Sequence, residues 1–157
     1  MGSKKRTRTA AADEGFFAVA KRRVVPFDFV LTELEALAPT TRPMFGCTAV
    51  YVDDKIMLIL RDRPTHAADN GVWLATVREH HESLREELPC MRSIGVLAGG
   101  GETGWQLLPA DAAEFEDAVL RACELVRAGD PRIGKIPKPR RPRGPRRVGA
   151  AKRTRAL

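Results

Sequence analysis

Charge is segregated along this chain of 157 residues, and the segregation limits which part of it can fold. Residues 1–25 carry a net charge of +5, and residues 132–157 carry +11 without a single acidic residue. Residues 26–131 hold nine Lys/Arg against eighteen Asp/Glu, a net charge of −9. Segments with high net charge and few apolar residues cannot bury enough surface to fold. We therefore expect one folded acidic domain, 26–131, between two basic flexible arms, 1–25 and 132–157.

Neither arm has the hydrophobic periodicity of a folded element. The N-terminal arm contains one apolar island, Phe16–Ala20, whose role stays open; a short helix docked on the domain is one interpretation. The C-terminal arm is rich in Lys, Arg, Pro and Gly, and its prolines at 137, 139, 142 and 145 prevent a regular ladder. We expect this arm to be extended and solvated.

Apolar runs and cysteines indicate the compartment. No run approaches the roughly 20 apolar residues of a membrane helix, and the basic start lacks the apolar stretch of a secretory signal. Cys47, Cys90 and Cys123 are odd in number, far apart and set in apolar segments, as is typical of reduced, buried thiols. We expect a cytoplasmic protein without disulfides, metal, cofactor or membrane association.

The first half of the domain alternates between helical and strand patterns. Apolar residues at helical spacing predict a helix over 27–38, ended by Pro39. Two apolar runs separated by a polar turn predict antiparallel strands at 47–52 and 56–60. A surface loop, 64–70, then leads into a third strand over 71–76.

The second half follows the same logic. Residues 77–88 predict a short helix closed by Pro89, and 93–98 with 105–108 predict a strand pair joined by the glycine-rich loop 99–104. The last helix begins at a capping box formed by Asp111 and Glu114 and stops at Gly129. The predicted order is α-β-β-β-α-β-β-α. It describes an α+β two-layer sandwich with a mainly antiparallel five-stranded sheet covered by helices.

One segment resembles a known family. Arg42-Pro43-Met44-Phe45-Gly46, followed by a strand, an acidic turn with Lys55, a second strand and a closing helix, resembles the TfoX N-terminal domain over about residues 27–130. The resemblance implies a two-layer α+β fold, a regulatory role in competence for DNA uptake, and no catalytic residues. Pro43 and Cys47 replace a second Arg and a second Gly of the family pattern, and the basic arm stands in place of a second domain.

The motif residues are Arg42, Met44, Phe45 and Gly46. We interpret the apolar side chains among them as structural. Apolar residues beside a strand are usually buried. We therefore expect Met44 and Phe45 to be core anchors rather than ligand contacts. Gly46 is expected to provide a tight entry into the strand, where its missing side chain tolerates unusual backbone angles.

Residues capable of chemistry are scattered. His66, His80 and His81 could join Cys47 or Cys90 in a zinc site or a Cys-His pair, but their spacing requires neither. The glycines at 99–101 lead into a strand rather than a helix, unlike a phosphate-binding loop. Acids at 114, 116 and 117 suit the first turn of a helix for dipole reasons alone. We do not expect an enzyme.

The arms carry the strongest functional signal. Arginine forks match phosphate geometry, and each neutralised phosphate releases counterions. The run Arg143-Gly144-Pro145-Arg146 partly resembles an AT-hook, whose core is Arg-Gly-Arg-Pro, so backbone attraction is favoured over minor-groove reading. The expected nucleic-acid contacts are Lys4, Lys5, Arg6, Arg8, Arg140, Arg141, Arg143, Arg146, Arg147, Lys152, Arg153 and Arg155.

The sequence thus predicts a TfoX-like regulatory or nucleoid-associated protein that binds DNA or RNA with weak sequence preference. Its acidic domain would bind a protein partner or a second copy. Three other interpretations of the C-terminal arm stay open: a solubilising extension, a segment folded on its own domain, or a patch for acidic lipid. The alternative for the whole chain is a protein-interaction module of secretion-chaperone-like fold, whose sheet edge accepts a peptide strand.

Overall fold

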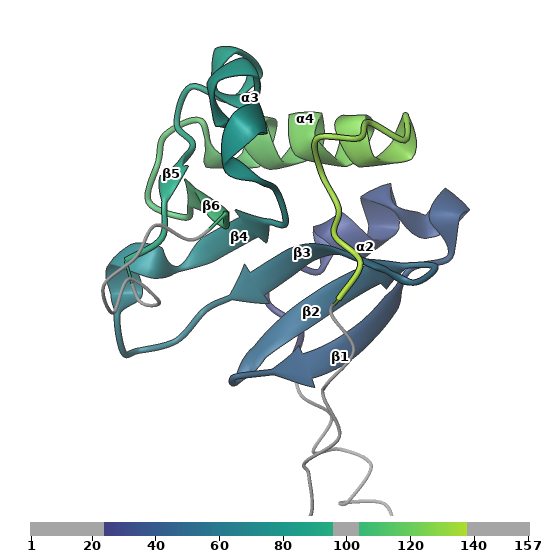
Figure 1. Cartoon of the computed structure of the whole chain (residues 1–157). Coiled ribbons are helices and arrows are strands. Elements are labelled where there is room, and N and C mark those ends of the chain that lie inside the picture. Colours follow the sequence, from purple (N-terminus) through teal and green to yellow (C-terminus); the bar gives the residue numbers. More distant parts are fainter. Residues whose placement is uncertain (1–23, 96–103, 138–157) are drawn as a thin grey trace, which may run out of the picture.

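In the part of the chain that the structure describes, six antiparallel strands form one sheet, and three helices cover one of its faces (Figure 1). The structure is a computed structural model that describes residues 24–95 and 104–137. The island Phe16–Ala20 and most of the glycine-rich loop lie outside these residues. The elements are α2 Phe29–Glu33, β1 Thr40–Met44, β2 Cys47–Val52, β3 Lys55–Arg61, β4 Gly71–Leu74, α3 His81–Glu87, β5 Arg92–Ser93, β6 Gln106–Pro109 and α4 Phe115–Arg127, with 3-10 turns at Glu35–Leu37, Ala67–Asp69 and Arg78–His80.

The strand order in the sheet is β1-β2-β3-β4-β6-β5. The α+β class and the antiparallel sheet are confirmed, but the expected five strands become six in the described part of the chain, because β1 was not predicted. Strand β1 is an exposed edge strand with Pro43 in it, so it has neither the alternation nor the β-branched apolar residues of a half-buried strand. It pairs with β2 through the two-residue turn Phe45–Gly46.

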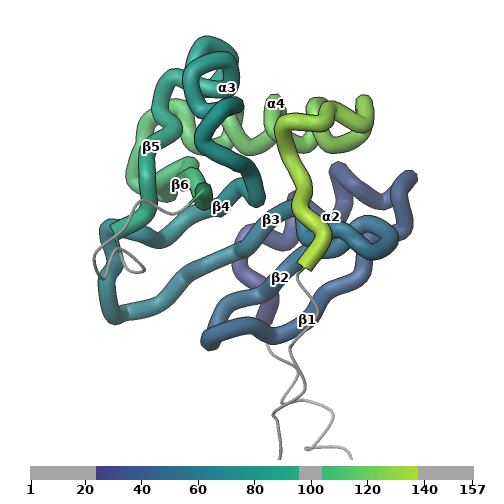
Figure 2. The backbone as a smooth tube through the Cα atoms, in the orientation of Figure 1, coloured from purple at the N-terminus to yellow at the C-terminus, as the bar shows by residue number. Residues whose placement is uncertain are grey.

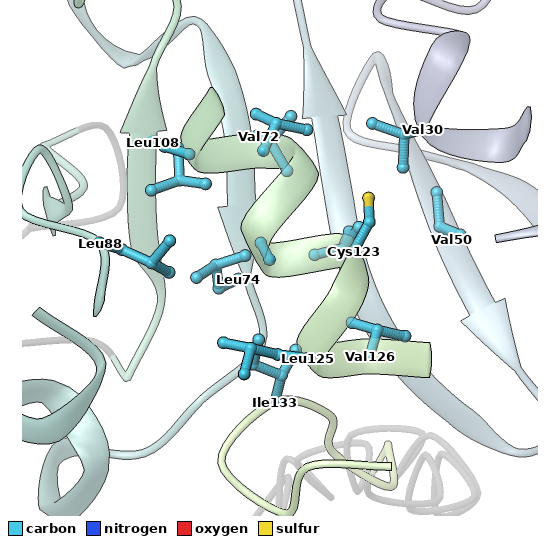
Figure 3. Packing of buried hydrophobic residues seen from close by; sticks show 14 of the residues in the cluster. Val30, Val50, Val72, Leu74, Leu88, Leu108, Cys123, Leu125, Val126 and Ile133 are labelled. Carbon is cyan, nitrogen blue, oxygen red and sulfur yellow. The ribbon is translucent and has the colours of Figure 1, made fainter. Parts of the chain in front are cut away.

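The main core lies between the sheet and the helices (Figure 3). Strands β2, β3 and β4 contribute Val50, Leu58 and Val72 to it, while α2 contributes Val30 and α4 contributes Cys123. All five side chains are fully buried. Burial of a branched aliphatic side chain stabilises a fold by roughly 1.5–3 kcal/mol, so the packing of the helices on the sheet contributes substantially to stability.

The last helix has the expected end but not the expected start. Helix α4 begins at Phe115 after Glu114, which makes no side-chain capping bond, so the predicted capping box at Asp111 is wrong. At the other end, Gly129 has a φ of +70°. The Gly129 amide donates to the Val126 carbonyl oxygen at 3.0 Å and the Asp130 amide to that of Leu125 at 3.0 Å. This pattern is the Schellman motif, and it confirms the predicted glycine stop.

The other two helices are shorter than predicted. The apolar stripe over 27–38 forms only α2 and a 3-10 turn, because Leu34 leaves the helical region with φ −97° and ψ 4°. Residues 78–80 likewise form a 3-10 turn before α3 begins. Over a single turn, residues three apart lie on one side of both an α-helix and a 3-10 helix, so the apolar spacing did not distinguish the two and overestimated the α-helical lengths.

The packed chain continues past Pro131, where composition had placed the start of the arm. After α4 the chain returns to the sheet (Figure 2). Ile133 is 3% exposed and joins the main core, and the Gly134 amide donates to the Ala75 carbonyl oxygen at 2.7 Å. Lys135 and Ile56 exchange two backbone hydrogen bonds of 2.9 Å. Residues 132–135 therefore belong to the body, not to the arm.

Candidate functional site

The face of the sheet opposite the helices carries a second apolar cluster. Side chains alternate along a strand, so Ile59, Trp73 and Leu107 point away from the helices that cover their neighbours. Part of this cluster borders a pocket of about 280 Å³. The lining residues come from β1, the β1–β2 turn, β2, β3, the loop after β3, β4 and the residue before β6: Met44, Phe45, Cys47, Ile59, Arg61, Arg63, Thr65, His66, Trp73 and Trp105.

Two indole rings form one wall of this pocket. The ring centroids of Trp73 and Trp105 are 6.3 Å apart at an interplanar angle of 57°. Trp73 is buried and its Nε1 donates to the Asp69 carbonyl oxygen at 2.9 Å, which fixes the ring. The wall is therefore aromatic, and its inner ring is held by the loop before β4.

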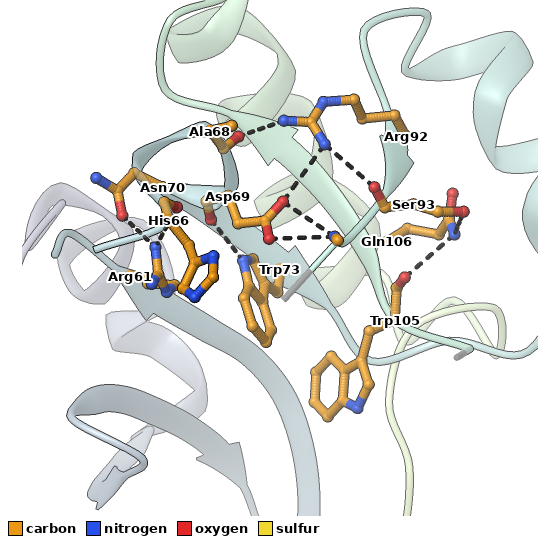
Figure 4. Close-up of polar contacts among 11 residues, drawn as sticks. Arg61, His66, Ala68, Asp69, Asn70, Trp73, Arg92, Ser93, Trp105 and Gln106 are labelled. Carbon is orange, nitrogen blue, oxygen red and sulfur yellow. Dashed lines mark hydrogen bonds and ion pairs between the residues drawn. The ribbon is translucent and has the colours of Figure 1, made fainter. Parts of the chain in front are cut away.

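Arg61 brings a positive charge to the pocket although its side chain is buried. The residue is 3% exposed. Its Nη1 donates to the His66 carbonyl oxygen at 2.9 Å and to Asn70 Oδ1 at 2.6 Å (Figure 4). Its Nη2 donates to the Thr65 carbonyl oxygen at 2.6 Å. All three acceptors are neutral, so these bonds orient the guanidinium group without neutralising it.

Asn70 ties the loop after β3 together. Its Oδ1 accepts from the Arg63 amide at 2.9 Å and its Nδ2 donates to the Arg63 carbonyl oxygen at 2.8 Å. The same Oδ1 accepts from Arg61. One amide side chain thus fixes the backbone of Arg63 and the guanidinium of Arg61 together, and it sets the position of both positive charges relative to the sheet.

Asp69, a buried acid of the same loop, does not line the pocket. Asp69 is 4% exposed, and its carboxylate accepts from the Gly95 amide at 3.1 Å and pairs with Arg92 Nη1 at 3.5 Å. Arg92 Nη2 also donates to the Ala68 carbonyl oxygen. Asp69 does not line the pocket, and its charge is directed to the β5 side of the loop.

The β1–β2 turn forms the rim of the pocket. Phe45 has φ 51° and Gly46 has φ 75°, the left-handed pair typical of a type I′ hairpin turn. Phe45 is 83% exposed, so its predicted role as a core anchor is wrong: at a two-residue turn its side chain projects beyond the sheet. Arg63 Nη1 donates to the Phe45 carbonyl oxygen at 2.7 Å. A Cβ on Gly46 would lie 1.9 Å from that same Nη1, so an alanine there would force the Arg63 side chain to move, in addition to straining φ.

The other motif residues lie on β1. Met44 is half-buried: it packs against the second apolar cluster, which agrees in part with the predicted core anchor, but it also lines the pocket. The Arg42 guanidinium carbon lies 4.9 Å from the Tyr51 ring centroid, a cation–π contact on the edge strand. The motif therefore builds an edge hairpin with one aromatic side chain at its tip.

Of the histidines and cysteines considered for chemistry, the structure brings His66 and Cys47 to one pocket and places His81 and Cys90 elsewhere. His66 and Cys47 line the pocket, His81 Nε2 lies 3.0 Å from the Gly104 carbonyl oxygen, and Cys90 lines a different pocket beside Glu87. In residues 24–95 and 104–137 no three His, Cys, Asp or Glu side chains gather closely enough to hold a metal ion.

All three thiols are free. Burial raises the pKa of the Cys47 thiol, while the charges of Arg61 and Arg63 reduce that rise. Cys47 and Cys123 are buried as predicted, whereas Cys90 is half-buried.

All twelve basic residues predicted to contact nucleic acid lie outside the described ranges. Of the basic residues in 132–157, the structure describes Arg132 and Lys135, and the body engages both. Arg132 Nη2 pairs with Asp130 at 2.8 Å and also with Glu87. Lys135 Nζ lies 5.8 Å from the Trp105 ring centroid, and burial lowers the pKa of this amine. Across the described ranges, every helix is too short or too polar to cross a bilayer.

Comparison with known proteins returns no relative: no family model, no curated protein and no solved structure matches this chain.

The pocket was not predicted from the sequence. Its signal was present, because 47–52 and 56–60 are apolar at both odd and even positions, as strands buried on both faces are.

Proposed function

We propose that this protein is a TfoX-like regulatory or nucleoid-associated protein that binds DNA or RNA through its basic arms with little sequence preference. The supporting observation is the segregation of charge. With the body redrawn as 24–137, it holds eleven Lys/Arg against eighteen Asp/Glu, a net charge of −7. The arms 1–23 and 138–157 carry +5 and +9. A polyanion would be repelled by the body and attracted by both arms.

The attachment points of the arms add support. Val24, the first described residue, lines a pocket with Gly46 and Cys47, and Pro137, the last, lines another with Met44. Both arms therefore join the body beside the β1–β2 hairpin. Two attachments at one hairpin allow both arms to reach the same stretch of phosphate backbone.

Strand addition at a sheet edge, the alternative function, has less support. At one edge, β1 contains Pro43, which has no N–H to offer a further strand. At the other edge, the described part of β5 is only Arg92–Ser93. Short edge strands and edge prolines are features by which proteins avoid pairing with another chain.

A salt titration tests the proposal. We would compare the full chain with a chain ending at Pro137, using fluorescence anisotropy with labelled duplex DNA and with single-stranded RNA. If about six phosphates are neutralised, the slope of log K against log salt for duplex DNA is about −5. The shortened chain should show a much smaller slope.

Ending the chain at Pro131 instead would remove Ile133 from the core and confuse lost binding with lost folding. Equal binding by both chains would exclude the C-terminal arm as the binding element, and a flat response to salt would exclude both arms.

A further inference from the structure

We infer that the pocket behind the β1–β2 turn binds a small aromatic carboxylate, with its ring against Trp105 and its carboxylate at Arg61 and Arg63. Nothing in the proposed nucleic-acid binding assigns this site, and the inference does not depend on that function. It rests on the charge, the burial and the wall composition of one pocket.

The pocket is positive in a body that is negative. Its lining includes two arginines and one histidine, and none of its lining residues is acidic. The body around it holds many more acids than bases. Local positive charge surrounded by low-dielectric walls selects an anion, because field lines are focused where water is displaced.

Arg61 lacks a counterion. Its three hydrogen bonds reach neutral oxygens, and in residues 24–95 and 104–137 it makes no ion pair with a carboxylate. A guanidinium group has five N–H donors; the bonds to these oxygens use three and a hydrogen bond to the Cys47 side chain uses another, so one remains for a ligand. A buried charge without a partner is costly, and an incoming carboxylate would remove that cost. Arg63 stands beside it with only one of its own donors used by the turn.

The remaining walls determine the rest of the ligand. These walls offer two indole rings, an aliphatic side chain and a thioether, from Trp73, Trp105, Ile59 and Met44. Flat rings and sulfur pack well against an aromatic ring. A volume of about 280 Å³ lies at the small end for ligand sites, so a single ring with a short acidic side chain fits better than a larger molecule.

The chain supplies its own reporter. Its two tryptophans are Trp73 and Trp105, and both line the pocket, so intrinsic fluorescence excited at a wavelength where a phenyl ring does not absorb reports occupancy. We would titrate the full chain with 3-phenylpropionate and, separately, with 3-phenylpropionamide, which has the same shape without the charge. We expect saturable quenching by the acid and at least about tenfold weaker binding of the amide. Equal binding of acid and amide would overturn the inference.

Matched variants test the anion contact. Arg63→Gln removes a guanidinium group from the pocket, and Arg85→Gln removes one from the exposed face of α3 at the same cost in net charge. We expect R63Q to weaken 3-phenylpropionate binding at least about tenfold while R85Q leaves it unchanged. Arg61→Lys retains the positive charge but loses the paired N–H donors of the guanidinium group. We expect an intermediate loss of 3-phenylpropionate affinity. Thermal unfolding monitored by circular dichroism verifies that each variant is folded. Equal affinity of R63Q and R85Q would refute the site.

Discussion

The Arg63 guanidinium lies across the β1–β2 turn and donates to the Phe45 carbonyl oxygen at 2.7 Å. This contact is possible because Gly46, the next residue, has no side chain where the guanidinium passes. The turn and the pocket are therefore one mechanical unit: the residue that contributes charge to the pocket also holds the tip of the hairpin.

Replacing Gly46 by Ala should cost more than replacing Gly129 by Ala. Both glycines have a φ near +70°, so both variants suffer left-handed strain of about 1–2 kcal/mol. Only at Gly46 does the new Cβ meet another group, Arg63 Nη1; at Gly129 nothing lies within 4 Å. Urea unfolding of the two variants gives the difference. Adding Arg63→Ala to G46A should reduce its loss of unfolding free energy toward that of G129A. If the stability does not recover, the guanidinium group is not the obstacle.

Phe45→Asn should stabilise the protein. Phenylalanine is unfavourable at φ 51°, whereas Asn is the preferred first residue of a type I′ turn. Little burial is lost, because Phe45 is 83% exposed. We expect a gain of about 1 kcal/mol, which thermal unfolding would register as a rise in Tm of a few degrees. Phe45→Ala, which retains the strain and removes the ring, should change stability by less than about 0.5 kcal/mol. A loss above about 2 kcal/mol in F45A would restore the core-anchor interpretation.

Arg132 should stabilise the protein at neutral pH and not in acid. Its hydrogen bonds lower the pKa of Asp130, and together with Arg121 it lowers the pKa of Glu87. A carboxyl whose pKa is lower in the folded state contributes stability above its unfolded pKa, near 4, and loses it as pH falls through the folded value. We expect Arg132→Gln to cost about 1 kcal/mol at pH 7 and the difference from wild type to shrink below about pH 4. Urea unfolding between pH 7 and acid pH measures the difference in unfolding free energy between wild type and R132Q. A difference that is constant with pH would mean that the variant loses packing rather than charge interactions.

Ile133→Ala should destabilise the body by about 2–4 kcal/mol, the usual cost of removing a buried aliphatic side chain. Ile136→Ala offers a matched control three residues later, because Ile136 is 64% exposed while Ile133 is 3% exposed. Denaturant midpoints of the two variants measure the contrast. Similar midpoints would return the folded boundary to Pro131.

Alkylation should distinguish the three thiols. Burial raises the pKa of Cys123 to about 12, so its thiolate is nearly absent at pH 8. Iodoacetamide should modify the half-buried Cys90 first, Cys47 more slowly and Cys123 only after denaturation. Peptide mass mapping over time gives the order, with urea-treated protein as the reference for full reaction. Early labelling of Cys123 in the native protein would contradict the packing of α4.

Local patterns predicted the helix-covered side of the fold well. The stripe that includes Val119 and Val126 produced α4, and Gly129 ended it as its left-handed φ requires. Strand β1 escaped prediction because an exposed edge with a proline has no hydrophobic signature. The exposure of Phe45 depends on pairing: once Met44 faces Cys47, the two residues between them must form the turn.

The pocket was harder to predict for a different reason. Cys47, Arg61 and Trp105 meet only through the strand order, in which β6 lies beside β4. No local pattern contains that neighbourhood. Apolar residues at both odd and even positions of β2 and β3 indicate only that the second face of the sheet is buried or binds something.

One core cluster includes Val30, near the beginning of the body, and Ile133, near its end. The main core is thus incomplete until almost the whole body has been translated. Because contacts so distant in sequence close late and slowly, we expect the body to fold as one cooperative unit once residue 135 has left the ribosome. Nascent chains shorter than this would expose the inner surfaces of β2 and β3 and depend on chaperones for protection.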